Sequence, residues 1–135
     1  MALTANSIMT PQAPKSGSCA LTTANTTFTT TPTNTVLLVT AGANGSRLTK
    51  LEFVPLENVT ANALQWYRST DSGTTKYLAG MALGGSDTVS GTDAATTVSG
   101  GFSDDAPMIL QANERIYVAT GITKGYHVNA EWSDY

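Results

Sequence analysis

The sequence contains few charged residues, and this shortage excludes one large class of partners. Seven Lys and Arg and ten Asp and Glu make up 13% of the 135 residues and give a formal net charge of −3. An average soluble domain is about 25% charged. A domain that grips nucleic acid through its phosphates presents a basic face, so we expect no direct contact with nucleic acid.

Reactive side chains are equally scarce. Cys19 is the only cysteine and His127 the only histidine, so neither an intrachain disulfide nor a thiolate zinc site can form. The Gly-x-Ser-x-Gly turn of many serine hydrolases does not occur. Asp87, Asp93 and the pair Asp104–Asp105 lack the spacing of a calcium-binding loop. We therefore expect no enzyme activity, no catalytic residue, no metal and no cofactor.

Long apolar runs and helical periodicity are also missing. No window approaches the roughly 20 apolar residues of a transmembrane helix, and no segment repeats its apolar residues with a helical period. Residues 1–9 lack the basic stretch followed by an apolar stretch that marks a secretory signal peptide. We expect little helix, no membrane partner, and synthesis in a cytoplasm, with any extracellular location reached by release.

Small hydroxyl side chains are abundant instead. The chain has 23 threonines and 11 serines, and β-branched threonine favours strands. Turn-forming residues such as Asn44–Gly45 and Asp71–Gly73 separate short apolar or alternating segments. The alternation in 46–55 is interrupted near Thr49–Leu51, which predicts a β-bulge. The pattern predicts strands over residues 35–40, 46–55, 62–69, 74–83, 107–110, 115–120 and 126–132, with a weak strand over 94–98.

Strands at this spacing predict an all-β fold, a single-domain β-sandwich. Eight or nine short strands and the long Gly/Ser/Thr segment 84–101 favour a jelly-roll-like arrangement. Residues 1–18, which contain prolines and a glycine, are interpreted as an extended N-terminal arm, and residues 19–135 as the sandwich domain. The threonine-rich run 20–35 is interpreted as an edge strand that ends at Pro32, with a disordered tail as the alternative.

The candidate contacts with a partner are residues of the arm and two neighbouring aromatic residues. Aromatic side chains on a β-sandwich can form a sugar-binding platform where they are exposed, and they fill the core where they are buried. The sequence leaves both interpretations open for Trp66, Tyr67, Tyr77 and Trp132. The predicted partner-binding residues are Leu3, Ile8, Met9, Pro11, Pro14, Trp66 and Tyr67.

Three segments resemble a known family. Gly42–Leu48 leads into a predicted strand, Ile109–Ile116 contains the turn Leu-Gln-Ala-Asn-Glu-Arg-Ile, and Tyr126–Tyr135 ends on Ser-Asp-Tyr directly after a strand. In this order they resemble small β-sandwich auxiliary proteins of tailed-bacteriophage virions, called capsid decoration or cement proteins, over about residues 35–135. The segment 84–101 departs from the pattern of that family.

The resemblance implies a structural virion protein that binds the outside of the major capsid protein lattice and stabilises the head. It implies a homo-oligomer, commonly a homotrimer, that is synthesised in the host bacterial cytoplasm and located on the outer capsid surface. The arm, residues 2–18, would then reach a neighbouring subunit or the lattice by joining a sheet edge. The alternative is a carbohydrate- or receptor-binding module of a phage tail or fibre that uses exposed Trp or Tyr.

Overall fold

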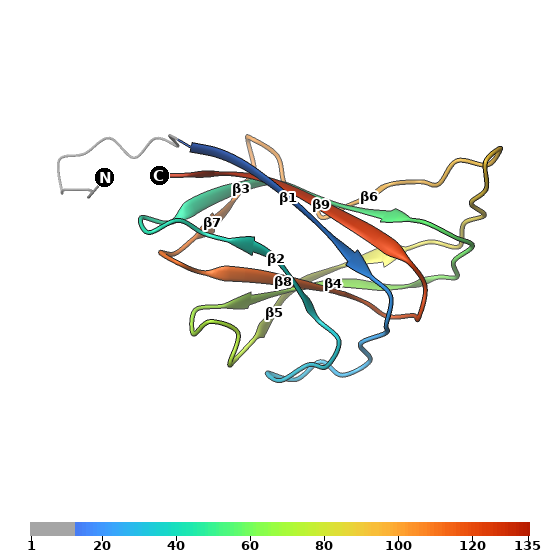
Figure 1. Cartoon of the computed structure of the whole chain (residues 1–135), viewed down its shortest axis with the longest axis horizontal. Helices are drawn as coiled ribbons and strands as arrows, with labels where there is room; N and C mark the ends of the chain where they lie inside the picture. The colour runs from blue at the N-terminus through green and yellow to red at the C-terminus, as the bar shows by residue number, and fades with distance from the viewer. Residues whose placement is uncertain (1–12) are drawn as a thin grey trace.

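Two antiparallel sheets pack face to face (Figure 1). The computed structural model describes residues 13–135, and this part contains nine strands and no helix. It accordingly holds no helix long and apolar enough to cross a membrane. The strands are β1 Ala13–Leu21, β2 Val36–Thr40, β3 Ser46–Pro55, β4 Asn62–Ser69, β5 Tyr77–Gly84, β6 Val98–Ser99, β7 Met108–Leu110, β8 Arg115–Thr120 and β9 Tyr126–Asp134.

The strand order is that of a jelly roll. Sheet A has the order β1-β9-β3-β6, with β7 also paired to β3, and sheet B has the order β2-β8-β4-β5. β6 and β7 follow one another along the same side of β3 and act as one interrupted strand. The pairs are then first with last, second with second-last, and so on inward, which is a long hairpin wound into two sheets. The predicted all-β, jelly-roll-like sandwich is confirmed.

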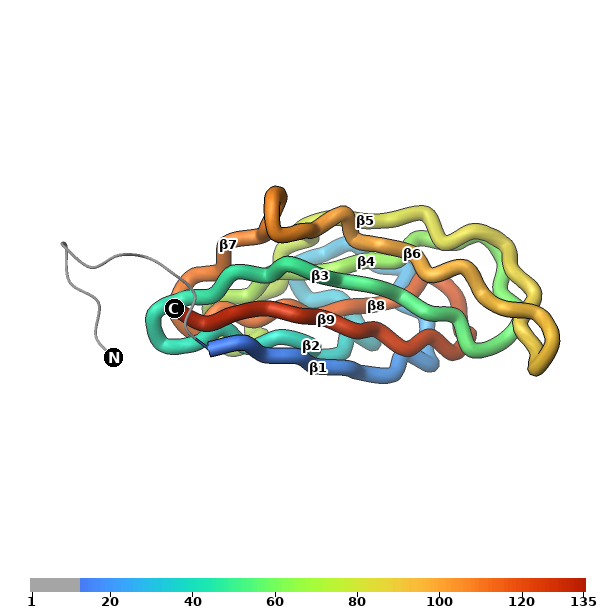
Figure 2. Tube along the Cα trace, turned by 90° about the horizontal axis from the view of Figure 1, so that it is seen from above, coloured from blue at the N-terminus to red at the C-terminus, as the bar shows by residue number. Residues whose placement is uncertain are grey.

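The two sheets leave one pair of edge strands on each flank. Figure 2 shows β1 and β2 along one flank and β5 with β6 and β7 along the opposite flank. β1 and β5 are therefore edge strands far apart on the body. β9 is an inner strand of sheet A and is held along both of its edges, because it pairs with β1 on one side and with β3 on the other.

Several local predictions are confirmed. The pairing of β3 with β9 shifts register between Leu48 and Lys50, where the sequence predicted a bulge. The turn at Asn44–Gly45 is present, and Gly45 has a φ of 86°. A Cβ at Gly45 would lie 2.6 Å from the carbonyl oxygen of Leu110, so both conformation and space require glycine there.

The predicted boundary of the arm at residue 18 is wrong. β1 begins at Ala13 and pairs with β9 over all nine residues, from Ala13 opposite Asp134 to Leu21 opposite Tyr126. Its lysine, proline, glycine and serines have little strand propensity, so the neighbouring ladder determines its conformation. Gly17 fits because a Cβ there would lie 3.1 Å from the ring of Trp132. Residues 1–12 lie outside the described residues.

The edge strand predicted over 20–35 is also wrong beyond the end of β1. Residues 22–35, here called the threonine segment, make one isolated bridge, between Ala24 and Thr120. The Lys76 N–H donates to the carbonyl of Thr30 at 2.9 Å. The segment lies over the outer face of sheet B instead of extending its edge, so its backbone has no neighbouring strand to form a ladder.

The long segment 84–101 contains less strand than expected. A strand was predicted over 94–98, whereas β6 covers Val98–Ser99. The segment is attached to the body by an isolated antiparallel bridge between Val59 and Asp87, and the Asp87 carboxylate accepts a hydrogen bond from the Thr96 N–H at 2.6 Å. Local side-chain caps therefore take the place of a ladder in this segment.

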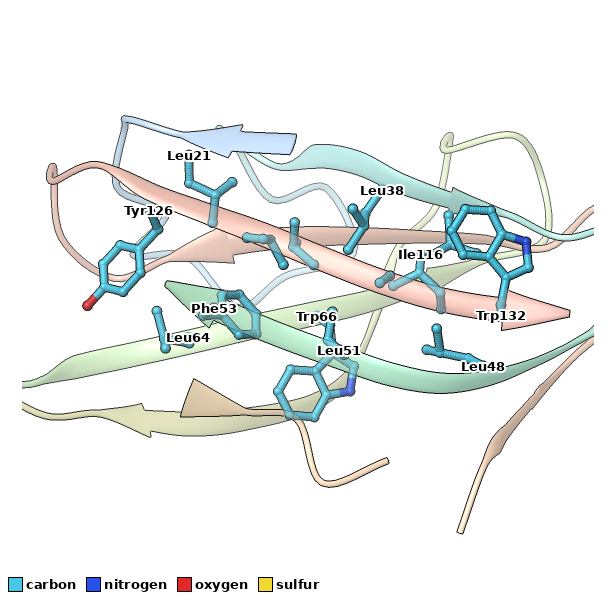
Figure 3. Packing of buried hydrophobic residues seen from close by; sticks show 14 of the residues in the cluster. Leu21, Leu38, Leu48, Leu51, Phe53, Leu64, Trp66, Ile116, Tyr126 and Trp132 are labelled. Carbon is cyan, nitrogen blue, oxygen red and sulfur yellow. The ribbon is translucent and has the colours of Figure 1, made fainter. Parts of the chain in front are cut away.

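The core lies between the sheets and draws large apolar side chains from both (Figure 3). Each large apolar side chain that is fully buried contributes roughly 1.5–3 kcal/mol, so this cluster is the main source of stability. Its largest members include Leu21, Leu48, Leu51, Phe53, Leu64, Trp66, Leu110, Ile116, Tyr126 and Trp132.

Candidate functional site

The structure separates the predicted partner-binding residues into three groups. Pro14 is exposed on β1, opposite Ser133. Trp66 and Tyr67 on β4 are buried, so the prediction that they contact a partner is corrected: neither side chain reaches the surface. The remaining predicted residues lie outside the described residues: Leu3, Ile8, Met9 and Pro11.

Trp66 fills the core on the flank of β5. It is 5% exposed, and its ring centroid lies 6.3 Å from that of Phe53 and 6.0 Å from that of Phe102, the latter edge to face. A Cβ at Gly80 of β5 would lie 2.5 Å from the indole ring. The glycine lets the indole pack directly against the backbone of β5, so Trp66 has a structural role.

Tyr67 points to the opposite face, where the threonine segment covers it. The Asn25 side-chain amide donates to Oε1 of Gln65 at 2.8 Å and to the Tyr67 hydroxyl at 2.9 Å. The Tyr67 hydroxyl donates to the same Gln65 oxygen at 2.8 Å, and Gln65 Nε2 donates to the Asn25 carbonyl at 3.0 Å. All three residues are fully buried. Burial raises the pKa of Tyr67 above its ordinary value.

A buried ion pair closes one end of the sandwich. The carboxylate of Glu114 is almost fully buried, and the guanidinium of Arg68 donates to both of its oxygens, with Nη2 distances of 2.9 and 2.8 Å. Arg68 also donates to the carbonyl of Ile109 on β7 at 2.9 Å. Arg68 thus ties sheet B to sheet A. Glu114 comes from the Ile109–Ile116 motif, and its role here is structural.

His, Cys, Asp and Glu side chains do not gather into a metal-binding group in the part of the chain that the structure describes. No three His, Cys, Asp or Glu residues lie close enough to hold a metal ion among residues 13–135. An open surface hollow of about 690 Å³ is lined by Asn58, Asp87 and Asp93 among others. The Asp87 carboxylate accepts hydrogen bonds from backbone N–H groups and so closes its loop. His127 lies apart from it, exposed on β9.

An exposed apolar row runs along β5. Leu78, Met81 and Leu83, here called the β5 strip, are 38%, 52% and 77% exposed. They lie opposite Tyr67, Gln65 and Ala63 of β4 and therefore share the outer face of sheet B. β5 contains no charged residue. The sequence carries a signal for this row, because large apolar residues alternate there with Ala and Gly, but the pattern alone does not say which face of the strand is covered.

A shallow hollow of about 270 Å³ adjoins this strip on the outer face. Phe28 of the threonine segment, Ala63 and Ile122 contribute its apolar lining, and Phe28 is itself exposed. Isolated exposed apolar residues are common on protein surfaces. A contiguous row on an edge strand is different, because it combines apolar area with unpaired backbone groups and so marks an interaction surface.

No family model, curated protein or solved structure matches this chain. The functional argument therefore rests on geometry. The described residues show two features suited to binding other proteins: β1, which continues residues 1–12 into sheet A, and the uncovered edge of β5.

Proposed function

We propose that this chain is a structural virion protein that binds the outside of a major capsid protein lattice as a homo-oligomer and stabilises the shell. The body supplies a rigid unit, because one apolar cluster unites both sheets and the buried side chains of Asn25, Gln65 and Glu114 are hydrogen-bonded. Contacts made through its N-terminal segment and edges would hold neighbouring capsid subunits together.

The observation that carries this proposal is the ladder between β1 and β9. A force applied to residues before Ala13 acts along β1 and meets nine paired residues at once. The Ser18 hydroxyl adds a 2.6 Å hydrogen bond to Oδ1 of Asn129. Because β9 also pairs with β3, the load passes into the middle of sheet A. This arrangement suits a tether between a compact body and a lattice.

The low charge of the chain supports the same function. With 13% charged residues and a net charge of −3, copies can lie close together without strong mutual repulsion. Each contact needs to contribute only a few kcal/mol, because many copies on one particle act together.

The test removes residues 2–12 and leaves β1 intact. Capsids would be purified from a phage lacking the gene, mixed with intact or shortened protein, and sedimented. We expect the shortened protein to lose most of its co-sedimentation, while its far-ultraviolet circular dichroism stays that of the intact chain. A deletion through residue 18 is a poor test, because it removes six of the nine residues of β1.

A matched control replaces residues 2–12 by a Gly/Ser segment of equal length, which separates the effect of sequence from that of length. Full binding by the deletion variant would contradict the tether. Mass spectrometry of purified particles provides the second readout, because a protein that covers the lattice is present in many more copies than a tail module.

The structure gives no support to the alternative carbohydrate-binding function as it was predicted. That function relied on exposed Trp or Tyr, and Trp66, Tyr67 and Trp132 are buried. Tyr77 is exposed, but a sugar platform needs a wider aromatic surface than one ring.

A further inference from the structure

β5, one of the two edge strands of sheet B, has the properties of a self-association surface. β5 pairs with β4 on one side only, so alternate residues direct their N–H and C=O groups away from the sheet. Proteins usually protect such edges with charged residues, prolines or short strands. β5 is eight residues long and has neither a charge nor a proline between Tyr77 and Gly84.

We propose that β5 pairs antiparallel with β5 of a second copy of this chain about a two-fold axis. The two copies of sheet B, each of four strands, would then form one continuous sheet. The inference goes beyond the proposed function and does not depend on it.

The geometry of β5 determines the register. The pairing with β4 is interrupted between Trp66 and Tyr67, which leaves Ala79 without a partner residue. The regular part of the strand therefore runs from Gly80 to Gly84, and its midpoint is Ala82. A two-fold pairing that uses this whole part places Ala82 opposite Ala82 of the second copy.

This register is self-complementary on both faces. On the outer face it sets Met81 opposite Leu83 of the second copy, twice, and covers two strongly exposed side chains. On the inner face it sets Gly80 opposite Gly84, so no side chain obstructs the approach. A shift by one residue would set Met81 against Ala82, which points to the other face, and is thereby excluded.

Charge and size specify the occupant further. An uncharged strand brings no like charges together when it meets its own copy, whereas it offers nothing to a charged partner. A contact made by the five residues Gly80–Gly84 of each copy buries less surface than the roughly 800 Å² per partner of a stable complex. We therefore expect a dimer that dissociates on dilution. A two-fold contact gives two copies, whereas a trimer joins two different surfaces.

Disulfide cross-linking tests the register directly. In a Cys19→Ser background, Met81→Cys and Leu83→Cys are prepared separately and oxidised alone or as a mixture. Directly opposite residues lie about 4.5–5.5 Å apart between Cα atoms, within disulfide range. Residue 81 and its own copy lie diagonally, at about 7–8 Å. We expect several-fold more dimer from the mixture than from either variant alone.

Ser16→Cys in the same background is the matched control, because Ser16 lies exposed on β1, an edge strand on the opposite flank. Sedimentation equilibrium of Leu83→Lys against the unaltered chain is the second measurement, and we expect the substitution to abolish the two-chain species. Equal cross-linking in all samples, a single-chain mass at every concentration, or a three-chain mass would overturn the proposal. Leu83→Lys leaves residues 1–12 intact, so its capsid binding distinguishes this inference from the tether.

Discussion

Replacing Asn25 by alanine tests whether the threonine segment is fixed to sheet B by one buried amide. The Asn25 side chain donates hydrogen bonds to Gln65, to Tyr67 and to the carbonyl of Thr27, the last at 3.1 Å. Alanine removes this amide group, whose two N–H donors are shared among the three acceptors. The backbone bond from the Asn25 N–H to the Thr120 carbonyl, 2.8 Å long, remains, so the segment is weakened and stays in place.

The expected loss follows from these contacts. A buried hydrogen bond contributes a net of about 1 kcal/mol, so the loss of the two amide N–H donors lowers the unfolding free energy by about 2 kcal/mol. A domain of this size has roughly 5–15 kcal/mol of stability, and the variant should therefore fold. Its melting temperature should fall by roughly 7 °C.

Urea unfolding followed by tryptophan fluorescence measures the free energy, and hydrogen exchange measured by mass spectrometry locates the change. We expect faster exchange in residues 22–35 than in β9. Thr26→Ala is the matched control, because Thr26 is the exposed neighbour of Asn25 and should change stability little. A loss below about 1 kcal/mol, or exchange that rises equally everywhere, would refute the assignment of Asn25 as the anchor.

Two further predictions concern a thiol and an ion pair. Burial raises the pKa of Cys19 from its ordinary value of 9.0 to about 11, so between these values the unfolded chain releases a proton that the folded chain keeps. Stability should therefore fall as pH rises from 9 to 11, and Cys19→Ala should flatten this part of the urea-midpoint profile; parallel profiles would contradict the shift. Glu114→Gln should lower the unfolding free energy by about 2 kcal/mol, because it weakens the charge-assisted hydrogen bonds from Arg68, whose side chain stays 37% exposed to solvent. Glu131→Gln, which breaks the exposed pair with Lys50, should cost less than about 1 kcal/mol. Equal losses in the two glutamine variants would show that burial of Glu114 contributes nothing.

Sequence reasoning recovered the elements whose local pattern and environment agree. Alternation of apolar and polar residues predicts the inner strands β3, β4, β8 and β9 and the bulge next to Thr49. Backbone requirements predict the turn at Gly45. In each case the nearest neighbours in sequence carry enough information.

It failed where contacts distant in sequence decide the conformation. β1 is a strand because β9, more than 100 residues later, supplies its ladder, and nothing local in Ala13–Leu21 indicates this. The threonine segment has strand propensity but lies across a sheet face, where Asn25 bonds to Gln65 and Tyr67. Propensity describes a residue's preference, and tertiary contacts override it.

The candidate contact residues failed for a related reason. Trp66 and Tyr67 point to opposite faces of one strand, and a sequence cannot reveal that both faces are covered. The exposed row on β5 was not predicted, because the inward side of the strand is occupied by Gly80 beneath an indole ring rather than by a large side chain.

The position of β9 has a consequence for how the chain folds during synthesis. The last strand in sequence is an inner strand of sheet A, between the first strand and the third. Before β9 is made, β1 has no partner in that layer and β3 can pair only with the short strands β6 and β7. Sheet A can close only after residue 134 has left the ribosome, so folding should be slow and late, and a nascent chain stalled before Tyr126 should remain sensitive to protease.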